Sequence, residues 1–171
     1  DSQYFSDGGL GLDIAAEELA FENLDSAITT MLLEFPKGLG SAIKGYARAD
    51  NHERVNHYLQ IMGEGFIQKH FDGVKHIPYL CAIQGYLLSG NIEKINELID
   101  TGNCSVMTTI HALAATEEKD RLEALLANQS EDIQAVGRKR ASEIFSLLGR
   151  HDLANSITAH PDAERLKVIH D

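Results

Sequence analysis

The sequence has little cysteine, proline or tryptophan and no long hydrophobic run. Of 171 residues, two are Cys, three are Pro and none is Trp. Two cysteines cannot build the disulfide framework of a small secreted domain, and three prolines exclude a collagen-like or proline-rich linker chain. Because no apolar run reaches about 18 residues, we expect no integral membrane segment.

Positive charge is also scarce. Lys and Arg number 15 against 26 Asp and Glu, which gives a net charge of -11. Such an excess of negative charge disfavours sequence-independent binding to phosphate backbones, so we expect no nucleic-acid partner. The rest of the composition is ordinary. Hydrophobic residues make up 43% and charged residues 24% of the chain, as in a soluble globular protein that buries a core.

The start of the chain and its two thiols give further expectations. The chain begins at Asp1 rather than at Met, which predicts a piece of a longer protein. Residues 1–12 are rich in glycine and are expected to form a loose lead-in, followed by a single domain over residues 13–171. Cys81 and Cys104 are expected to be reduced, which favours a reducing compartment.

Two segments of the sequence are similar to each other. Residues 42–59 read AIKGYARADNHERVNHYL and residues 82–99 read AIQGYLLSGNIEKINELI, so they align at a shift of 40 positions. The identical pairs are Ala42/Ala82, Ile43/Ile83, Gly45/Gly85, Tyr46/Tyr86, Asn51/Asn91, Glu53/Glu93 and Asn56/Asn96. Weaker copies follow at 15–32, 111–126 and 141–157. Internal similarity of this kind indicates a repeat architecture.

Each copy has the pattern of a helix, a tight turn and a second helix. The second helix carries apolar residues at i, i+3 and i+4, as in Val55, Tyr58 and Leu59. One such pair cannot bury its apolar stripe alone, so neighbouring pairs are expected to stack. The equivalent apolar residues are spaced by 40, 27 and 31 positions, which indicates degenerate repeats; they are Val55, Ile95, Leu122 and Leu153.

The predicted fold class is therefore all-α, with stacked antiparallel helix pairs that grade into a helical bundle. No alternating strand pattern of four or more residues is present. Helices are predicted over 13–34 (with a break near Asn23), 39–49, 51–71 (with an interruption at 63–65), 77–89, 91–101, 106–115, 117–127, 131–148, 150–158 and 161–169.

The stretch AIQGYLLSGNIEKINELIDTG, residues 82–102, resembles the helix–turn–helix part of an ankyrin repeat. A small-residue helix is followed by Gly, a polar residue, and a second helix that ends in a hydrophobic pair and Gly. The chain lacks the T-P-L-H tetrapeptide and a steady 33-residue spacing. Degenerate arrays of this style are also similar to domains of secreted effectors of intracellular bacteria. The resemblance implies another protein as partner, and a cytoplasmic location or translocation into a host cell.

No motif in the sequence indicates a metal or cofactor. His70, Asp72 and His76 flank a glycine-containing turn, but no fourth ligand accompanies them, so no metal site is predicted. The run Gly8-Gly9-Leu10-Gly11 has no strand before it and no Lys, and it is a weak phosphate signal. The basic cluster at 137–140 is expected to be one face of a helix whose other face packs in the core.

The favoured function is that of a protein–protein interaction module. We expect the protein to bind no cofactor. The expected partner-binding residues lie at turn and helix positions that vary between the two best copies; they are Arg48, Asp50, His52, His57, Leu88, Ile92 and Glu97. Two alternatives remain open. One is a helical enzyme, or part of one, with a Cys81 or Cys104 nucleophile that meets a histidine in space. The other is a structural or oligomerisation domain.

Overall fold

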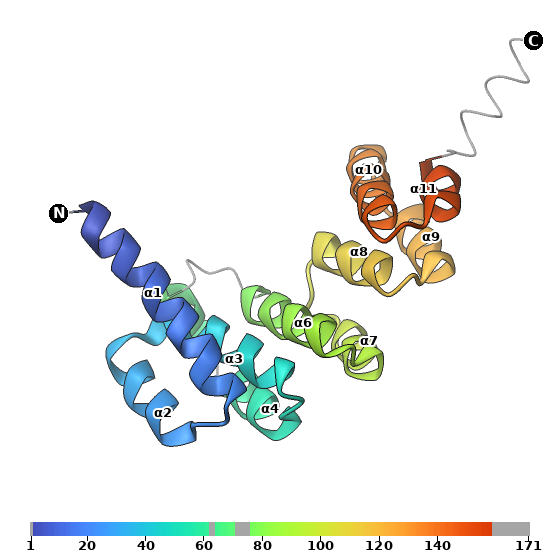
Figure 1. Ribbon diagram of the computed structural model, residues 1–171. Helices are drawn as coiled ribbons and strands as arrows, with labels where there is room; N and C mark the ends of the chain where they lie inside the picture. Colours follow the sequence, from blue (N-terminus) through green and yellow to red (C-terminus); the bar gives the residue numbers. More distant parts are fainter. Residues whose placement is uncertain (1, 62–63, 71–75, 159–171) are drawn as a thin grey trace, which may run out of the picture. The chain divides into compact units, whose positions relative to one another are not determined.

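A computed structural model describes residues 2–61, 64–70 and 76–158 (Figure 1). Every regular element in these ranges is helical and no strand occurs in them, which confirms the all-α prediction. Contacts divide the chain into two compact units, Asp1–Cys104 (unit 1) and Ser105–Asp171 (unit 2). The sequence instead predicts one domain over residues 13–171, because its apolar pattern continues past the boundary without a linker-like segment.

The helices follow the predicted ranges closely. Unit 1 contains α1 (Ser2–Phe21), α2 (Asp25–Glu34), the 3-10 helix η1 (Pro36–Gly38), α3 (Leu39–Arg48), α4 (His52–Gln60), α5 (Glu64–His70), α6 (Ile77–Ser89) and α7 (Ile92–Asp100). Unit 2 contains α8 (Val106–Ala115), α9 (Lys119–Ala127), α10 (Glu131–Leu147) and α11 (His151–Thr158). The helix predicted over 161–169 lies outside the described residues. None of the described helices is both long and apolar enough to cross a membrane.

The loose lead-in expected over residues 1–12 is wrong, because α1 already begins at Ser2. Its glycines suggest a turn, but glycine costs a helix only about 1 kcal/mol relative to alanine. Ala16 and Ala20 of the same helix are fully buried. Once that packed part has formed, each further residue adds one hydrogen bond without a new nucleation step, so the helix extends through the glycines.

Helix α3 lies at the centre of unit 1, packed against both α1 and α6. Two glycines allow these helices to approach closely. A Cβ at Gly45 would overlap the carbonyl oxygen of Glu17 in α1, and a Cβ at Gly85 would overlap the carbonyl oxygen of Lys44 in α3. The equivalence of Gly45 and Gly85 in the sequence therefore has a structural reason, namely the same backbone contact at two successive helix pairs.

The same turn joins the two helices of each pair. In α3–α4, the N–H of Asp50 donates to the carbonyl of Ala47 and the N–H of Asn51 donates to that of Tyr46. This pair of hydrogen bonds is a Schellman motif, in which the residue that makes the first of them, here Asp50, adopts a left-handed conformation. The motif closes five pairs in the described part of the chain, with the left-handed residues Asn23, Asp50, Gly90, Glu117 and Gly149.

Numbering from the left-handed residue shows which side chains form the core. The fifth residue after it is buried in each of the five pairs; these residues are Ile28, Val55, Ile95, Leu122 and Ala154. The sequence correctly aligns Val55, Ile95 and Leu122, but it selects Leu153, which is partly exposed, in place of Ala154. The fourth residue before the turn is a large buried side chain in most pairs, as in Tyr46, Tyr86, Leu113 and Phe145.

Unit 2 offers a direct test of the turn. Glu117 has φ +60° and Gly149 has φ +74°. A residue with a Cβ loses roughly 1 kcal/mol in this conformation, whereas glycine does not. We expect Gly149→Ala to lower the free energy of unfolding by roughly 1 kcal/mol. Glu117→Gly relieves the same strain but removes the exposed ion pair of Glu117 with Arg150, so it should change the free energy of unfolding by less than about 1 kcal/mol. Urea unfolding measures both variants, and a Gly149→Ala variant as stable as the parent would contradict the left-handed conformation of Gly149.

Candidate binding surface

Successive turns are linked to each other by side-chain hydrogen bonds. In three cases the side chain of a left-handed residue accepts a hydrogen bond from the following helix pair. The donor is the residue that comes directly after the left-handed residue of that following pair. The bonds run from Asn51 Nδ2 to Asn23 Oδ1 (2.7 Å), from Asn91 Nδ2 to Asp50 Oδ1 (3.1 Å) and from Arg150 Nη1 to Glu117 Oε1 (2.9 Å). This contact gives the non-glycine residues in these turns a structural role.

A second contact also recurs between pairs of unit 1. The Tyr46 hydroxyl donates to Asp25 Oδ1 at 2.6 Å, and the Tyr86 hydroxyl lies 2.9 Å from His52 Nδ1. Burial raises the pKa of both tyrosines well above the usual range, and the hydrogen bond to Asp25 raises that of Tyr46 further. Both hydroxyls therefore stay protonated at neutral pH and act as hydrogen-bonding groups that join neighbouring pairs.

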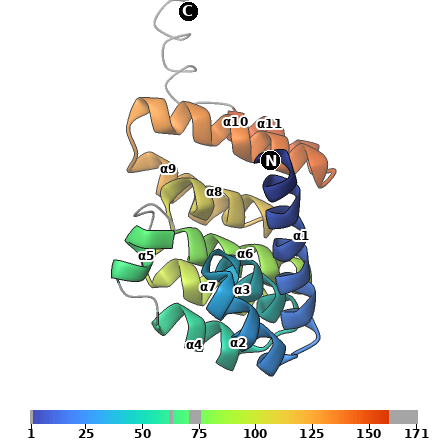
Figure 2. The same cartoon turned by 90° about the vertical axis from the view of Figure 1, so that its left-hand side faces the viewer.

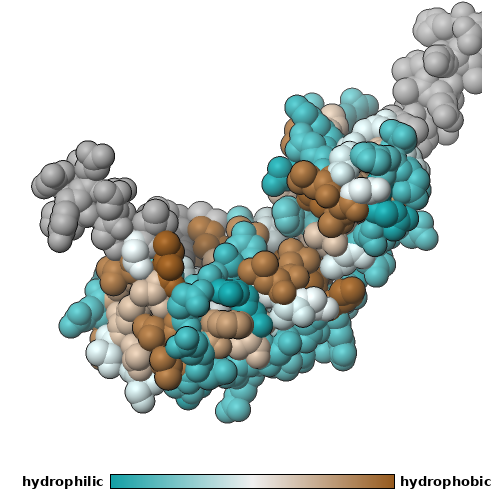
Figure 3. Space-filling model, viewed as in Figure 1, coloured by the Kyte–Doolittle hydropathy of each residue, from teal (hydrophilic) through white to brown (hydrophobic). Residues whose placement is uncertain are grey.

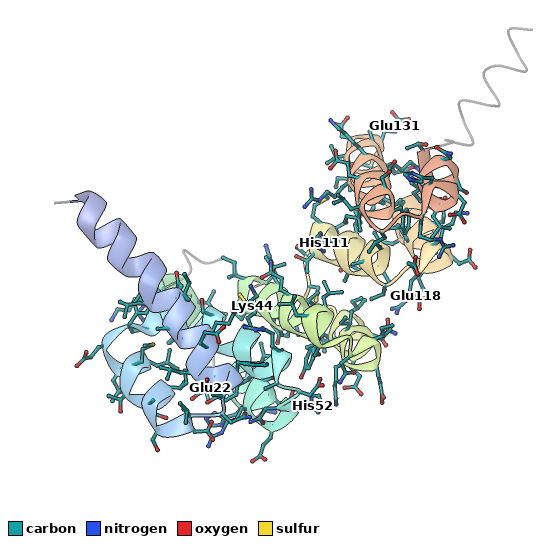
Figure 4. All side chains as sticks on the ribbon, viewed as in Figure 1. Glu22, Lys44, His52, His111, Glu118 and Glu131 are labelled. Atoms are coloured by element: carbon teal, nitrogen blue, oxygen red, sulfur yellow. The ribbon has the colours of Figure 1, made fainter. Side chains whose placement is uncertain are left out.

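Three of the seven residues predicted to bind a partner make contacts within unit 1. Arg48 Nη1 lies 2.8 Å from Glu17 Oε2, and its guanidinium stacks 4.4 Å above the centre of the Phe21 ring. Asp50 accepts the hydrogen bond from Asn91, and His52 contacts Tyr86. Figure 4 shows His52 at the start of α4. These groups are engaged in holding the helix pairs together.

The other four predicted residues lie at the surface of unit 1. Leu88 and Ile92 are 65% and 46% exposed on either side of the turn at Gly90. Glu97 forms an exposed ion pair with Lys94 at 3.0 Å. His57 is exposed on α4 and, of the seven, it alone lines the groove described next. The structure does not gather the seven residues into one pocket, and their role in partner binding stays a prediction.

An apolar groove of about 270 Å³ lies in unit 1 among α2, η1, α4 and α5. Its walls are mostly apolar, with two basic residues and one threonine; the lining residues are Thr29, Leu32, Leu33, Pro36, Leu39, Arg54, His57, Tyr58, Ile61 and Phe66. Leu33 is 80% exposed and Ile61 is 56% exposed. Figure 2 shows α5 and α4 on the side of unit 1 opposite α1, and Figure 3 shows apolar surface, brown and tan, over part of α2.

The sequence did not identify this groove, although it contains a signal for it. The left-handed residues Asn23 and Asp50 lie 27 positions apart, as do Gly90 and Glu117, whereas Asp50 and Gly90 lie 40 positions apart. The longer interval contains α5, which supplies Phe66 to the groove. Insertions into repeats often form the binding face of an array. The spacings of 40, 27 and 31 positions predict degenerate repeats, but they do not by themselves show that the longest interval contains an inserted helix.

Burial affects both cysteines and one histidine that the sequence offers as reactive groups. Burial raises the pKa of the Cys81 thiol to about 11, and burial also raises the pKa of Cys104. A nucleophilic cysteine needs the opposite shift, towards the thiolate. Burial lowers the pKa of His111, and the charge of Arg140 lowers it further. The described residues contain no group of three potential metal ligands. Of His70, Asp72 and His76, Asp72 lies outside the described residues.

Half of the basic cluster at 137–140 is buried in unit 2: Gly137 and Arg138 are buried, although three of the four residues are charged. Arg138 is 7% exposed; its Nη1 donates to the carbonyl of Ile157 at 2.9 Å and lies 3.1 Å from Glu123 Oε2. Gly137 faces the ends of the Leu126 and Ile110 side chains. Lys139 and Arg140 are exposed, as expected for the solvent-facing side of the helix, whereas Gly137 and Arg138 lie on its buried side, where Arg138 is held by contacts to α9 and α11.

Comparison with known proteins identifies no relative. No family model, no curated protein and no solved structure matches the chain. Any statement about function therefore rests on the geometry of the two units, and in particular on the linked turns and on the groove beside α5.

Proposed function

We propose that each of the two units is a short ankyrin-like array of stacked antiparallel helix pairs. Five pairs with one type of turn, a buried residue at the same position after each turn, and repeated bonds between successive turns support this arrangement. In such arrays each pair buries its apolar side against its neighbours, and the surface left over forms an extended binding face. Successive left-handed turn residues lie 27, 40, 27 and 32 positions apart, whereas a regular ankyrin array repeats every 33 or so residues.

The function proposed for this array is protein binding, as a scaffold or recognition module. The observation that carries it is the apolar groove of unit 1, which contains highly exposed leucine and isoleucine side chains beside an inserted helix. Exposed apolar side chains that gather around a depression are typical of interaction sites.

Site-specific photocrosslinking tests the binding surface. A benzoylphenylalanine at position 33 places the reactive group in the groove, whereas position 147, which is 86% exposed on α10, provides a matched control in unit 2. We expect a discrete adduct with another protein at position 33 and not at position 147. The same adducts at both positions would contradict the assignment. Adducts formed only between copies of this chain would instead favour the oligomerisation alternative.

Replacing Leu33 by Glu is expected to lower the affinity for the crosslinked partner at least tenfold. Burying a leucine side chain stabilises a complex by about 1.5–3 kcal/mol, and about 1.4 kcal/mol corresponds to a factor of ten. Because Leu33 is 80% exposed, the free energy of unfolding should change by less than about 0.5 kcal/mol. Titration calorimetry with the partner measures the affinity, and Leu147→Glu is the control that should leave it unchanged.

A further inference from the structure

We propose that the groove of unit 1 binds a short peptide segment in which bulky apolar side chains are followed by a carboxylate. This inference rests on the proposed protein-binding function and specifies its ligand. The apolar part would fill the depression between α2 and α5, and the carboxylate would be held by Arg54 and His57 of α4.

The size of the groove favours a few side chains over a cofactor. Its volume of about 270 Å³ lies just below the range of about 300–1,000 Å³ that small-molecule pockets usually have. Leu32, Tyr58 and Phe66 line it from three different helices, α2, α4 and α5. A peptide can place one or two apolar side chains in such a depression while its backbone stays at the surface.

The two basic residues of the groove, Arg54 and His57, also line a second pocket. Arg54 and His57 are separated by three positions on α4 and therefore share a face of that helix. Both also line an adjoining polar pocket, together with Glu53, Asn56 and Gln60. These two residues thus mark the place where the apolar groove passes into a polar surface, and both carry side chains that donate hydrogen bonds to a carboxylate.

Arg54 is held in position by the fold. Its Nη2 lies 3.1 Å from Asp25 Oδ2, while the other oxygen of Asp25 accepts from the Tyr46 hydroxyl at 2.6 Å. The contact with Asp25 engages one of the three guanidinium nitrogens, and the side chain remains 34% exposed. The His57 ring packs edge-on against Tyr58, with 5.0 Å between the ring centres. Both basic groups are therefore oriented before any ligand arrives, which reduces the entropy lost on binding.

Selection from a displayed peptide library on the full chain tests this inference. We expect enriched peptides to contain two bulky apolar residues and an Asp or Glu, and to lose binding to the Leu33→Glu variant. Replacing the acidic residue of a synthetic enriched peptide by its amide should weaken binding roughly tenfold. His57→Gln should weaken binding of the acidic peptide and leave the amide peptide unaffected. Arg54→Gln also removes the ion pair with Asp25, so for this variant the expected result is a smaller ratio between the affinities for the acidic and the amide peptide. Raising the salt to about 0.5 M should likewise weaken only the acidic peptide.

The outcomes separate this inference from the function on which it rests. Peptides that lose binding to Leu33→Glu but show no preference for a carboxylate would overturn the inference and leave protein binding at the groove supported. Enrichment of basic peptides, or of none, would also overturn the inference, while photocrosslinking at position 33 would decide the proposed function independently. Binding of dodecanoate in place of any peptide would assign the apolar and carboxylate chemistry to a lipid and overturn the inference.

Discussion

Replacing Gly85 by Ala is expected to lower the free energy of unfolding of unit 1 by about 2 kcal/mol. The added methyl group would overlap the carbonyl oxygen of Lys44, which belongs to the backbone of α3. A backbone atom in the middle of a helix cannot move aside alone, so α3 and α6 would have to separate along their contact. Overpacking of this kind typically costs about 1–3 kcal/mol, and here it outweighs the gain of roughly 1 kcal/mol in helix propensity.

Two other glycines provide matched controls in urea unfolding followed by far-UV circular dichroism. Gly11 also lies in a helix, but a Cβ there would meet no atom within 4 Å, so Gly11→Ala should stabilise by up to about 1 kcal/mol. A Cβ at Gly137 would meet only the ends of flexible side chains, Leu126 Cδ2 at 2.8 Å and Ile110 Cδ1 at 2.9 Å, so Gly137→Ala should have a small effect. Equal effects at Gly11 and Gly85 would show that the α3–α6 contact is looser than described.

The helices could be predicted from the sequence because their signals are local. Gly90 and Asn91 form a helix end followed by a cap: Gly90 has φ +74°, and the Asn91 side chain accepts from the N–H of Lys94 at 3.1 Å. The turn at Glu117 could be located only approximately, because a glutamate does not signal a left-handed residue. The Glu117 side chain accepts a hydrogen bond from Arg150, which lies 33 positions away in the sequence. The residues next to Glu117 do not reveal this contact.

The candidate site could be predicted only in part for the same reason. The difference between the two copies predicts a binding role for His57, which does line the groove. Arg48 and His52 also differ from the equivalent residues of the second copy. Their side chains, however, contact neighbouring helices within unit 1: Arg48 contacts α1 and His52 contacts α6. Variation between copies thus marks two kinds of position: those that contact a changed neighbour, and those that face solvent. A single sequence does not separate the two.

Replacing Phe145 by Ala is expected to lower the free energy of unfolding of unit 2 by about 3–5 kcal/mol. Phe145 is fully buried in α10, four positions before the left-handed Gly149, and it occupies the position that Tyr46 and Tyr86 fill in unit 1. Truncating a buried phenylalanine removes its apolar contacts and leaves a cavity that the surrounding helices fill only partly. Because α10 packs against α8, α9 and α11, this cavity would loosen the centre of the unit.

The matched control for this variant lies two residues further along the same helix. Leu147 is 86% exposed, so Leu147→Ala should change the free energy of unfolding by less than about 0.5 kcal/mol, although it removes a side chain of the same chemical class. Urea unfolding of the full chain measures both variants, with the slope of the transition checked for each. Comparable losses in the two variants would mean that the residue four positions before the turn is not the buried anchor of its helix pair, and the proposed repeat would lose one of its defining positions.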